Sequence, residues 1–481
     1  ILRTVGIEQI AYKKSEEQFD QDGAVMAVES LAGNELAWYI PNINEGIRDV
    51  SPTVKVFLTQ NLLEPLLKGR AEELGAELFF GTEMVSFEQD RDGVTAVIRN
   101  RDSGTSSRVR AKYMVAADGT HSRVRDALGI RMLGHGVLSN SITIYFRGDV
   151  GHLMRGRNLS VIYVNNSDLT GFFRIEKPYQ SGFLAVNSLG TPEHPNMDVW
   201  DGLTDERCRE FLHISLGVSD VPLQIENVMR WQATADTAER FIEGRVFLAG
   251  DAAHSMPPTG GFGGNTGVQD AQNLAWKLAL VLQGVAGEEL LSTYDAERRP
   301  VGSFTVEQAY SRYVIRWAPH LGTSTIQPVE SDVDIDLGYR YRSKAVLPDS
   351  ADDGKLLEKT RETKGRPGTR APHLYLERNG SRISAIDLLG RNFVVLAGPE
   401  GGWWRAAAEA AARQARIEVE FHEIADAGFA ESYGITPGGA VLVRPDAVVG
   451  WRAQTKEGAS EQAAAHAMAR ILGRERPAAA R

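Results

Sequence analysis

Residues 244–282, GRVFLAGDAAHSMPPTGGFGGNTGVQDAQNLAWKLALVL, contain the pattern that decides the fold. The apolar run at 245–249 predicts a short buried strand, which Gly250 and Asp251 end. A loop rich in glycine and proline follows, so the backbone can approach a flat ligand without intervening Cβ atoms. From about Asn265 the pattern predicts a helix. Its apolar stripe contains Val268, Ala271, Ala275, Leu278 and Leu282, and Asp270, Asn273 and Lys277 lie off the stripe.

This order of elements suits a ligand that carries both hydroxyl groups and an anionic or electron-rich carbonyl group. The free amides and the dipole at a helix N-terminus attract such a carbonyl or an anion. A carboxylate at a strand end, here Asp251, can bind the hydroxyls of a sugar or ribityl chain. The simpler interpretation, a glycine loop that only connects a strand to a helix, is still open at this point.

The same stretch resembles, almost residue for residue, the GD motif of FAD-dependent aromatic hydroxylases, the single-component flavoprotein monooxygenases. The resemblance implies that Asp251 binds the ribityl chain of FAD and that Pro258 lies against the flavin ring. Gly264 and Asn265 match positions whose backbone amides face the pyrimidine edge of the flavin, and Gly263 belongs to the same cofactor-binding turn.

A second fingerprint of this family, DGxxSxxR, is matched by Asp118, Gly119, Ser122 and Arg125. It predicts a strand-to-helix turn whose carboxylate and amides help to hold the pyrophosphate region of FAD. Asp-Gly followed by Ser is also an ordinary turn and helix cap, so this motif alone would be weak. Two fingerprints in the expected order make the resemblance much stronger.

The pyrophosphate-binding unit expected in such proteins has no match in this sequence. That unit is a strand, a G-x-G-x-x-G turn and a helix, roughly 30 residues in all. Because residues 1–8 resemble a segment that follows this unit in the family, we expect an N-terminally truncated or incompletely recorded chain. Gln60 begins a helix predicted over 60–74 and matches a Gln that contacts FAD in the family. The alternative for Gln60 is a solvated residue in a first helical turn.

The expected fold is α/β, with a Rossmann-like FAD-binding domain, an inserted antiparallel sheet for the substrate and a thioredoxin-like C-terminal domain. The predicted parts are the FAD-binding domain (1–133 and 236–317), the substrate sheet (134–235), a connector (318–365) and the C-terminal domain (366–475). In the sheet, alternation places Thr143, Tyr145 and Arg147 on one face and Ile142, Ile144 and Phe146 on the other. The sequence does not decide which face meets the substrate.

The C-terminal domain resembles the thioredoxin-like domain of the polyketide and phenol hydroxylase branch, including the RPD turn at 444–446. Where thioredoxins carry CxxC, this chain has GPEGGWW, so we expect a structural or assembly role and no redox function. Cys208 is the single cysteine of the chain, which excludes an intrachain disulfide and a cysteine-built metal site.

Composition excludes further classes of function. The net charge of −10 argues against nucleic acid as a partner. No window approaches the roughly 18 consecutive apolar residues of a membrane span, so we expect a soluble, cytoplasmic protein without a membrane partner. We also expect no metal ion, since no metal cluster is discernible. A homo-oligomer is left open by the sequence.

The resemblance implies reduction of FAD by NADPH or NADH, reaction of the reduced flavin with O2 to a C4a-hydroperoxide, and transfer of one oxygen atom to an aromatic ring. The implied substrate is a phenol, a hydroxypyridine or an aromatic polyketide, as in antibiotic biosynthesis. No catalytic side chain can be named. His254 is the candidate for acid-base chemistry, but a structural hydrogen-bonding role is the better interpretation. The alternatives are a ligand-binding protein that has lost FAD and a flavin halogenase, whose WxWxIP motif is not seen here.

Overall fold

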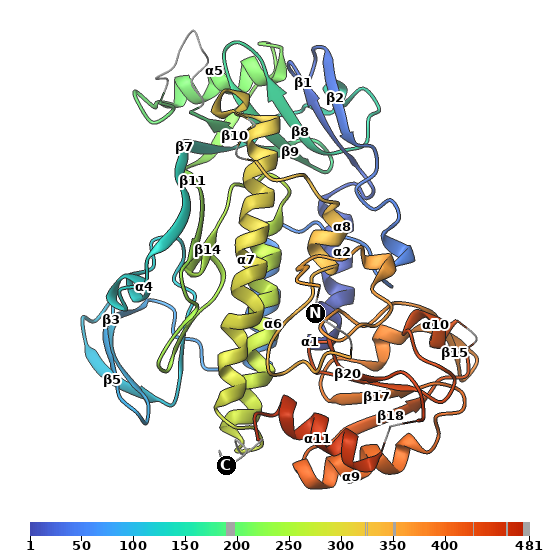
Figure 1. Ribbon diagram of the computed structural model, residues 1–481. Coiled ribbons are helices and arrows are strands. Elements are labelled where there is room, and N and C mark those ends of the chain that lie inside the picture. Colours follow the sequence, from blue (N-terminus) through green and yellow to red (C-terminus); the bar gives the residue numbers. More distant parts are fainter. Residues whose placement is uncertain are drawn as a thin grey trace.

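The computed structural model describes residues 1–188, 198–322, 324, 326–349, 353–426, 428–457 and 460–474. Two long helices run through the middle of the molecule, between a large sheet at one end and the C-terminal domain at the other (Figure 1). They are α6 (Phe262–Leu282) and α7 (Glu289–Arg316), and they pack against each other. Mixed helices and strands confirm the expected α/β class.

The large sheet has the strand order β14-β11-β7-β10-β9-β8-β1-β2. Its strands are β1 (Ala24–Val28), β2 (Glu35–Ile40), β7 (Met132–Arg147), β8 (Leu159–Asn165), β9 (Thr170–Glu176), β10 (Ser181–Asn187), β11 (Gln224–Ala238) and β14 (His254–Ser255). The antiparallel sheet predicted between residues 134 and 235 is present, since strands β7 to β10 lie in this range and their mutual pairings are antiparallel. Two strands from the N-terminal part join the same sheet, because β1 pairs in parallel with β8.

The two faces of this sheet have different environments. Helix α5 (Asp205–Leu216) covers one face, where Ile142, Ile144 and Phe146 are fully buried in a cluster with apolar residues of the helix. Thr143 and Tyr145 lie on the opposite face and are only half-buried. The predicted alternation is therefore confirmed, and the structure identifies the second face, called the open face below, as the accessible one.

Two smaller sheets carry the connections to the fingerprints. An antiparallel meander contains β3 (Thr82–Gln89), β4 (Val94–Asn100) and β5 (Ser106–Ala111). The next sheet has the order β12-β13-β6, with β6 (Met114–Ala116), β12 (Ile242–Glu243) and β13 (Val246–Leu248). The remaining helices of this half are α1 (Leu2–Val5), α2 (Glu8–Gln18), α3 (Gln60–Glu73) and α4 (Arg123–Ala127). The helix expected over 60–74 is confirmed as α3.

Helix α6 differs from its sequence pattern in orientation. An apolar stripe normally faces the core, yet Val268 and Leu282 are 40% and 47% exposed. The residues off the stripe, Asp270, Asn273 and Lys277, are fully buried. The predicted helix is confirmed, but its polar face and not its apolar stripe faces the interior. This is possible because the polar face has charged partners inside the molecule.

Helix α7 is longer than expected. Residues 288–299 read as a helical turn and cap, but α7 continues through Pro300 to Arg316. A proline inside a helix removes one backbone hydrogen bond. Most residues of the second half, among them Tyr310 and Tyr313, are buried against the large sheet and the loops beside it. This burial offsets the lost bond.

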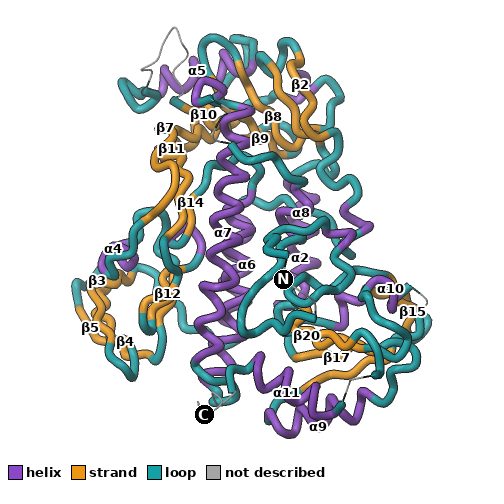
Figure 2. Tube along the Cα trace, viewed as in Figure 1, coloured by secondary structure: helices purple, strands orange, loops and turns teal. Residues whose placement is uncertain are grey.

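The C-terminal domain contains a four-stranded sheet, and helices lie against it (Figure 2). The strand order is β18-β17-β19-β20, with one parallel pair between β17 and β18. Its elements are β15 (Tyr375–Arg378), β16 (Ser381–Ser384), β17 (Phe393–Ala397), α9 (Trp404–Ala415), β18 (Val419–Glu423), α10 (Phe429–Ser432), β19 (Ala440–Val443), β20 (Val449–Ala453) and α11 (Glu461–Ile471). The connector contains α8 (Asp332–Leu337). The last residue of the predicted 366–475 domain lies outside the described residues, and the thioredoxin-like assignment stays a prediction.

Candidate functional site

The two fingerprints follow neighbouring parallel strands. Strands β6 and β13 pair in parallel, and the Ala249 amide donates to the Ala116 carbonyl at 3.0 Å just beyond the paired residues. Asp118 and Asp251 come shortly after these strand ends. Ligands of open α/β sheets bind at the carboxyl ends of the strands. Both carboxylates are thus at the edge where a dinucleotide is expected.

The flavin loop, residues 250–265, begins with a tight turn. Gly250 has φ +60°, and a Cβ on Gly267 would lie 3.1 Å from the Gly250 Cα, so the loop is pressed against the first turns of α6. Asp251 is exposed and makes no hydrogen bond or ion pair with any described residue. Burial on its protein side raises the pKa of the Asp251 carboxyl, and His254 opposes the shift. The carboxylate is available to accept from hydroxyl groups of a ligand.

The N-terminus of α6 is also available. Its N-cap is Gly261, and no side chain caps the helix. A Cβ at Gly264 would meet nothing within 4 Å, and Asn265 is exposed while its Nδ2 donates to the Gly261 carbonyl at 3.0 Å. Pro258 is exposed on the same loop. An uncapped helix start without side chains in front of it can accept an anion or a carbonyl group.

The second fingerprint is tied to this loop by Arg125. Asp118 Oδ2 accepts from the Val124 amide at 3.2 Å, and the Ser122 hydroxyl caps α4 by accepting from the Arg125 amide at 3.0 Å. The buried Arg125 guanidinium donates to the Ala252 carbonyl at 3.2 Å and to the Thr120 carbonyl at 3.0 Å. The sequence identified Arg125 only as a motif residue, whereas the structure shows it joining the two fingerprints.

Two further residues, Gly119 and Gln60, were predicted to bind the cofactor. Gly119 has φ +83°, a backbone conformation that favours glycine. Gln60 is the first residue of α3, is exposed and donates to Glu64 at 2.5 Å. Among the described residues, Gln60 makes no hydrogen bond to the flavin loop. The structure therefore brings Asp251, Pro258 and the α6 turn into one loop and leaves Gln60 apart from it.

Behind the loop lies a buried charged group that sequence reasoning missed. Asp270 Oδ2 accepts from the Gly250 amide at 3.1 Å and lies 2.6 Å from His254 Nε2. Asp270 Oδ1 lies 2.7 Å from Arg298 Nε, and all three side chains are fully buried. Burial alone would raise the pKa of the Asp270 carboxyl, but its contacts with His254 and Arg298 outweigh burial and hold that pKa below its usual value. The burial of His254 and its contact with Asp270 are compatible with the structural role expected for it, which stays a prediction. The signal for Asp270 was its place off the apolar stripe.

The residues present fit the flavin end of FAD. An unpaired carboxylate matches the ribityl hydroxyls, and an uncapped helix start matches the electron-rich edge of the ring. The glycines leave room for a flat ring system to approach the backbone. When bound, FAD supplies the oxygen chemistry, and the protein supplies binding and orientation. Within the described residues no group of histidine, cysteine and carboxylate side chains could hold a metal ion.

Comparisons with known proteins identify the two main parts of the chain. Residues 1–309 match the model of the FAD binding domain, and residues 364–475 match that of the aromatic-ring hydroxylase C-terminal domain. A 4-methyl-5-nitrocatechol 5-monooxygenase from Burkholderia sp is 48% identical over 98% of this chain and 89% of its own length. A tetracenomycin A2 monooxygenase-dioxygenase from Streptomyces glaucescens is 35% identical over 98% of this chain and 88% of its own.

A solved structure shows the same architecture. An aklavinone-11 hydroxylase in a ternary complex with FAD and aklavinone matches with a TM-score of 0.91 at 34% identity, over 98% of this chain and 89% of that chain. No described helix has the length and apolar character needed to cross a membrane. The family models, the relatives and the paired fingerprints lead to one conclusion: the chain belongs to the FAD-dependent aromatic-ring hydroxylases, the single-component flavoprotein monooxygenases.

Proposed function

We propose that this monooxygenase hydroxylates a phenol or catechol ring with an acidic substituent, bound on the open face of the large sheet. The observation that carries the proposal is an aromatic surface on that face that includes an unpaired cation. Phe172 stacks on Trp317 of α7 with ring centroids 5.6 Å apart. Phe183 lies 5.7 Å from Phe172 and 5.8 Å from Tyr145. Such a surface suits a flat ring.

The cation is Arg174, which is paired with Phe183 across strands β9 and β10. Its guanidinium lies 4.3 Å and 4.8 Å from the ring centres of Phe19 and Phe57. It makes no hydrogen bond or ion pair with the described residues, and its Nε is buried without a partner. Burial lowers the pKa of Arg174 to about 10, so the group stays charged at neutral pH. A phenolate, nitro or carboxylate oxygen would satisfy this guanidinium.

The relatives support a small acidic ring over the other candidates. The relative named for 4-methyl-5-nitrocatechol shares 48% of its residues with this chain, and the two relatives named for tetracenomycins share 35% and 38%. A nitrocatechol carries acidic oxygens, which fits Arg174. An aromatic polyketide or a hydroxypyridine is the second candidate, since the aromatic surface itself does not limit ring number.

The chain's own contribution to the reaction follows from these positions. The aromatic residues of the open face exclude water and orient the ring. The N-terminus of α6 stabilises negative charge that develops beside Gly264 and Asn265. We propose that Asp251, Pro258, Gly263, Gly264, Asn265, Asp118, Gly119 and Gln60 hold FAD, with NADPH or NADH as its transient reductant.

The test is NAD(P)H consumption with mass analysis of the products, across nitrophenols, catechols, hydroxypyridines and polyhydroxylated polycyclic rings. The expected result is faster NAD(P)H oxidation with acidic phenols or catechols, and a product heavier by one oxygen atom. Equal NAD(P)H oxidation with and without every ring, and no oxygenated product, would refute the proposal. A preference for neutral polycyclic rings would favour the second candidate.

A further inference from the structure

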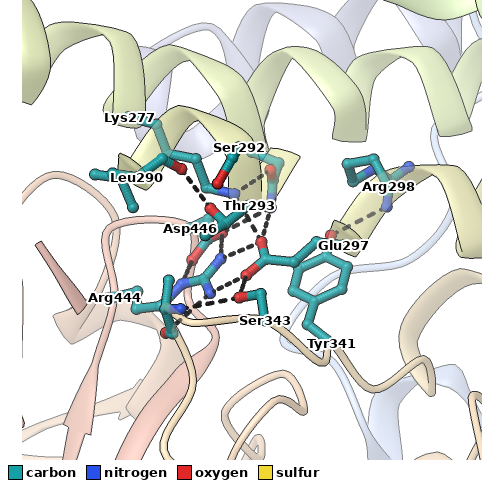
Figure 3. A network of polar contacts seen from close by, with 12 residues as sticks. Lys277, Leu290, Ser292, Thr293, Glu297, Arg298, Tyr341, Ser343, Arg444 and Asp446 are labelled. Atoms are coloured by element: carbon teal, nitrogen blue, oxygen red, sulfur yellow. Dashed lines mark hydrogen bonds and ion pairs between the residues drawn. The ribbon is translucent and has the colours of Figure 1, made fainter. Parts of the chain in front are cut away.

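The C-terminal domain meets α6 and α7 through a buried set of charges at its RPD turn (Figure 3). Arg444 binds Glu297 of α7 with two bonds, Nη1 to Oε1 at 2.6 Å and Nη2 to Oε2 at 2.9 Å. The same guanidinium bonds Asp446 Oδ1 through Nε at 3.0 Å. Arg444 and Glu297 are fully buried. The turn is therefore anchored by a bidentate ion pair that is closed to solvent.

Glu297 connects this turn to α6 as well. Lys277 Nζ lies 2.8 Å from Glu297 Oε2, and Asn273 Nδ2 donates to the same oxygen at 2.7 Å. Asn273 Nδ2 also lies 3.3 Å from Asp446 Oδ2. One carboxylate thus joins both long helices and the C-terminal domain.

The next residue on α7 carries the connection to the flavin loop. Arg298 bonds Asp270, and Asp270 accepts from the Gly250 amide. Asp270 shares a face of α6 with Asn273 and Lys277, because their spacings are three and four residues. A change in how α6 sits against α7 at Glu297 therefore also moves the carboxylate that holds the loop.

The charges of this region balance. The set, called the central charge cluster below, contains three cations and three carboxylates, Lys277, Arg298, Arg444, Asp270, Glu297 and Asp446, all buried. In a low-dielectric interior, removing one partner leaves an uncompensated charge, which drives rearrangement, protonation or entry of water. Loss of Arg444 would leave the cluster with one excess negative charge beside both helices.

We propose that Arg444 is a positioning residue for the flavin site, and that the C-terminal domain thereby fixes the loop that binds FAD. The action is indirect: Arg444 holds Glu297, Glu297 holds α6 against α7, and α6 presents Asp270 to Gly250. This gives the C-terminal domain a role in cofactor binding without a redox function. The inference rests on the FAD cofactor and does not depend on the aromatic substrate.

The test compares Arg444→Met and Arg444→Lys with a matched control, Arg452→Met, in the full chain. Arg452 is also an arginine of the C-terminal domain; its side chain is 8% exposed, and its Nε lies 2.5 Å from Asp349 Oδ2. Its other bonds to described residues go to the Lys364 and Tyr433 carbonyls, and within this part of the chain none reaches α6 or α7. The two measurements are amide hydrogen exchange of a peptide that spans the flavin loop, and the FAD dissociation constant from flavin fluorescence.

The expected result for Arg444→Met is exchange at least tenfold faster in the flavin loop and a tenfold weaker FAD affinity. Arg444→Lys should recover part of the exchange protection and part of the FAD affinity, since lysine keeps the charge without the bidentate geometry. Arg452→Met should change both by less than twofold. A purely stabilising Arg444 would lower the thermal midpoint in both methionine variants and leave loop exchange and FAD affinity unchanged, which would overturn the proposal.

If Arg444→Met does not fold, Ser343→Ala decides the question. Its hydroxyl donates to Glu297 Oε1 at 2.6 Å, so the substitution loosens Glu297 without changing any charge. Faster loop exchange in this folded variant supports the proposal, and unchanged exchange contradicts it. Loop exchange is measured without a substrate, so failure of every candidate ring to react would leave this result standing.

Discussion

The substitution Asp270→Asn removes the negative charge of this residue and keeps the size of its side chain. The carboxylate is fully buried and has three partners: the Gly250 amide at 3.1 Å, His254 Nε2 at 2.6 Å and Arg298 Nε at 2.7 Å. An asparagine in the same place offers one oxygen and one NH2 group. Whichever way the amide turns, a donor then faces a donor on one side, and the Arg298 charge loses its partner.

The magnitude follows from these contacts. Removing one partner of a buried ion pair costs about 3–5 kcal/mol of folding free energy. Only part of this free energy affects FAD binding, namely the loss of the hydrogen bond that fixes Gly250, about 1–2 kcal/mol. That loss corresponds to a 5- to 30-fold increase in the FAD dissociation constant, since about 1.4 kcal/mol is a factor of ten. We expect both effects: a lower urea midpoint of unfolding and weaker FAD binding.

The assay is titration of the FAD-free protein with FAD, followed by flavin fluorescence. Asp295→Asn is the matched control, because Asp295 also accepts a backbone amide, that of Phe241 at 2.7 Å, and pairs with Arg299 at 3.2 Å. Neither Phe241 nor Arg299 belongs to the flavin loop, and neither bond involves the Gly250 amide. The reasoning is refuted if Asp270→Asn binds FAD within twofold of the unmodified chain, or if the control weakens binding equally.

Three further outcomes are expected. Gly267→Ala would place a Cβ 3.1 Å from the Gly250 Cα; we expect several-fold weaker FAD binding in the same titration, with no polar contact removed. Burial raises the pKa of Asp336 to about 6, so the folded state keeps a proton that the unfolded chain releases above about pH 4. The unmodified chain therefore loses folding stability as pH rises from about 4 to 6. In urea unfolding, the stability of Asp336→Asn relative to the unmodified chain should be higher at pH 7 than at pH 4, by up to about 3 kcal/mol. Arg174→Met should raise KM for acidic phenols at least tenfold with a smaller change in kcat, while KM for neutral phenols and for NADPH stays constant; a raised KM for NADPH alone would assign Arg174 to the nicotinamide cofactor.

The strands and turns of the site could be predicted because their signals are local. The apolar run before Gly250, the glycines that follow and the helical spacing after Asn265 all act within one segment. The order of the two fingerprints placed β6 and β13 in one cofactor-binding unit, and the structure shows them as paired parallel neighbours. Alternation in β7 likewise identified which residues share a face. The position of helix α5 then showed which face is buried and which is the open face.

The polar face of α6 could not be predicted in the same way. Helical periodicity places Asp270 and Lys277 off the apolar stripe, on the face that normally meets solvent. A lone buried charge is costly, so burial of this face is not expected. Their partners are on another helix, at Arg298 and Glu297, and the charge that completes the set comes from Arg444. Only the tertiary fold brings these groups together. The full length of α7 also depends on the tertiary fold, because burial of the turns after Pro300 offsets the hydrogen bond that the proline removes.

Buried ion pairs are a poor means of joining a domain if stability alone is required, since apolar groups of similar size hold as well or better. Charges that must match in pairs do restrict how the elements can fit together. The bidentate contact of Arg444 with Glu297 has one geometry, and a shift of α6 by a single turn would take Lys277 away from Glu297 and Asp270 away from Arg298. The same shift would release the Gly250 amide. In this molecule the buried charges therefore determine a register, and the flavin loop is the element whose geometry depends on it.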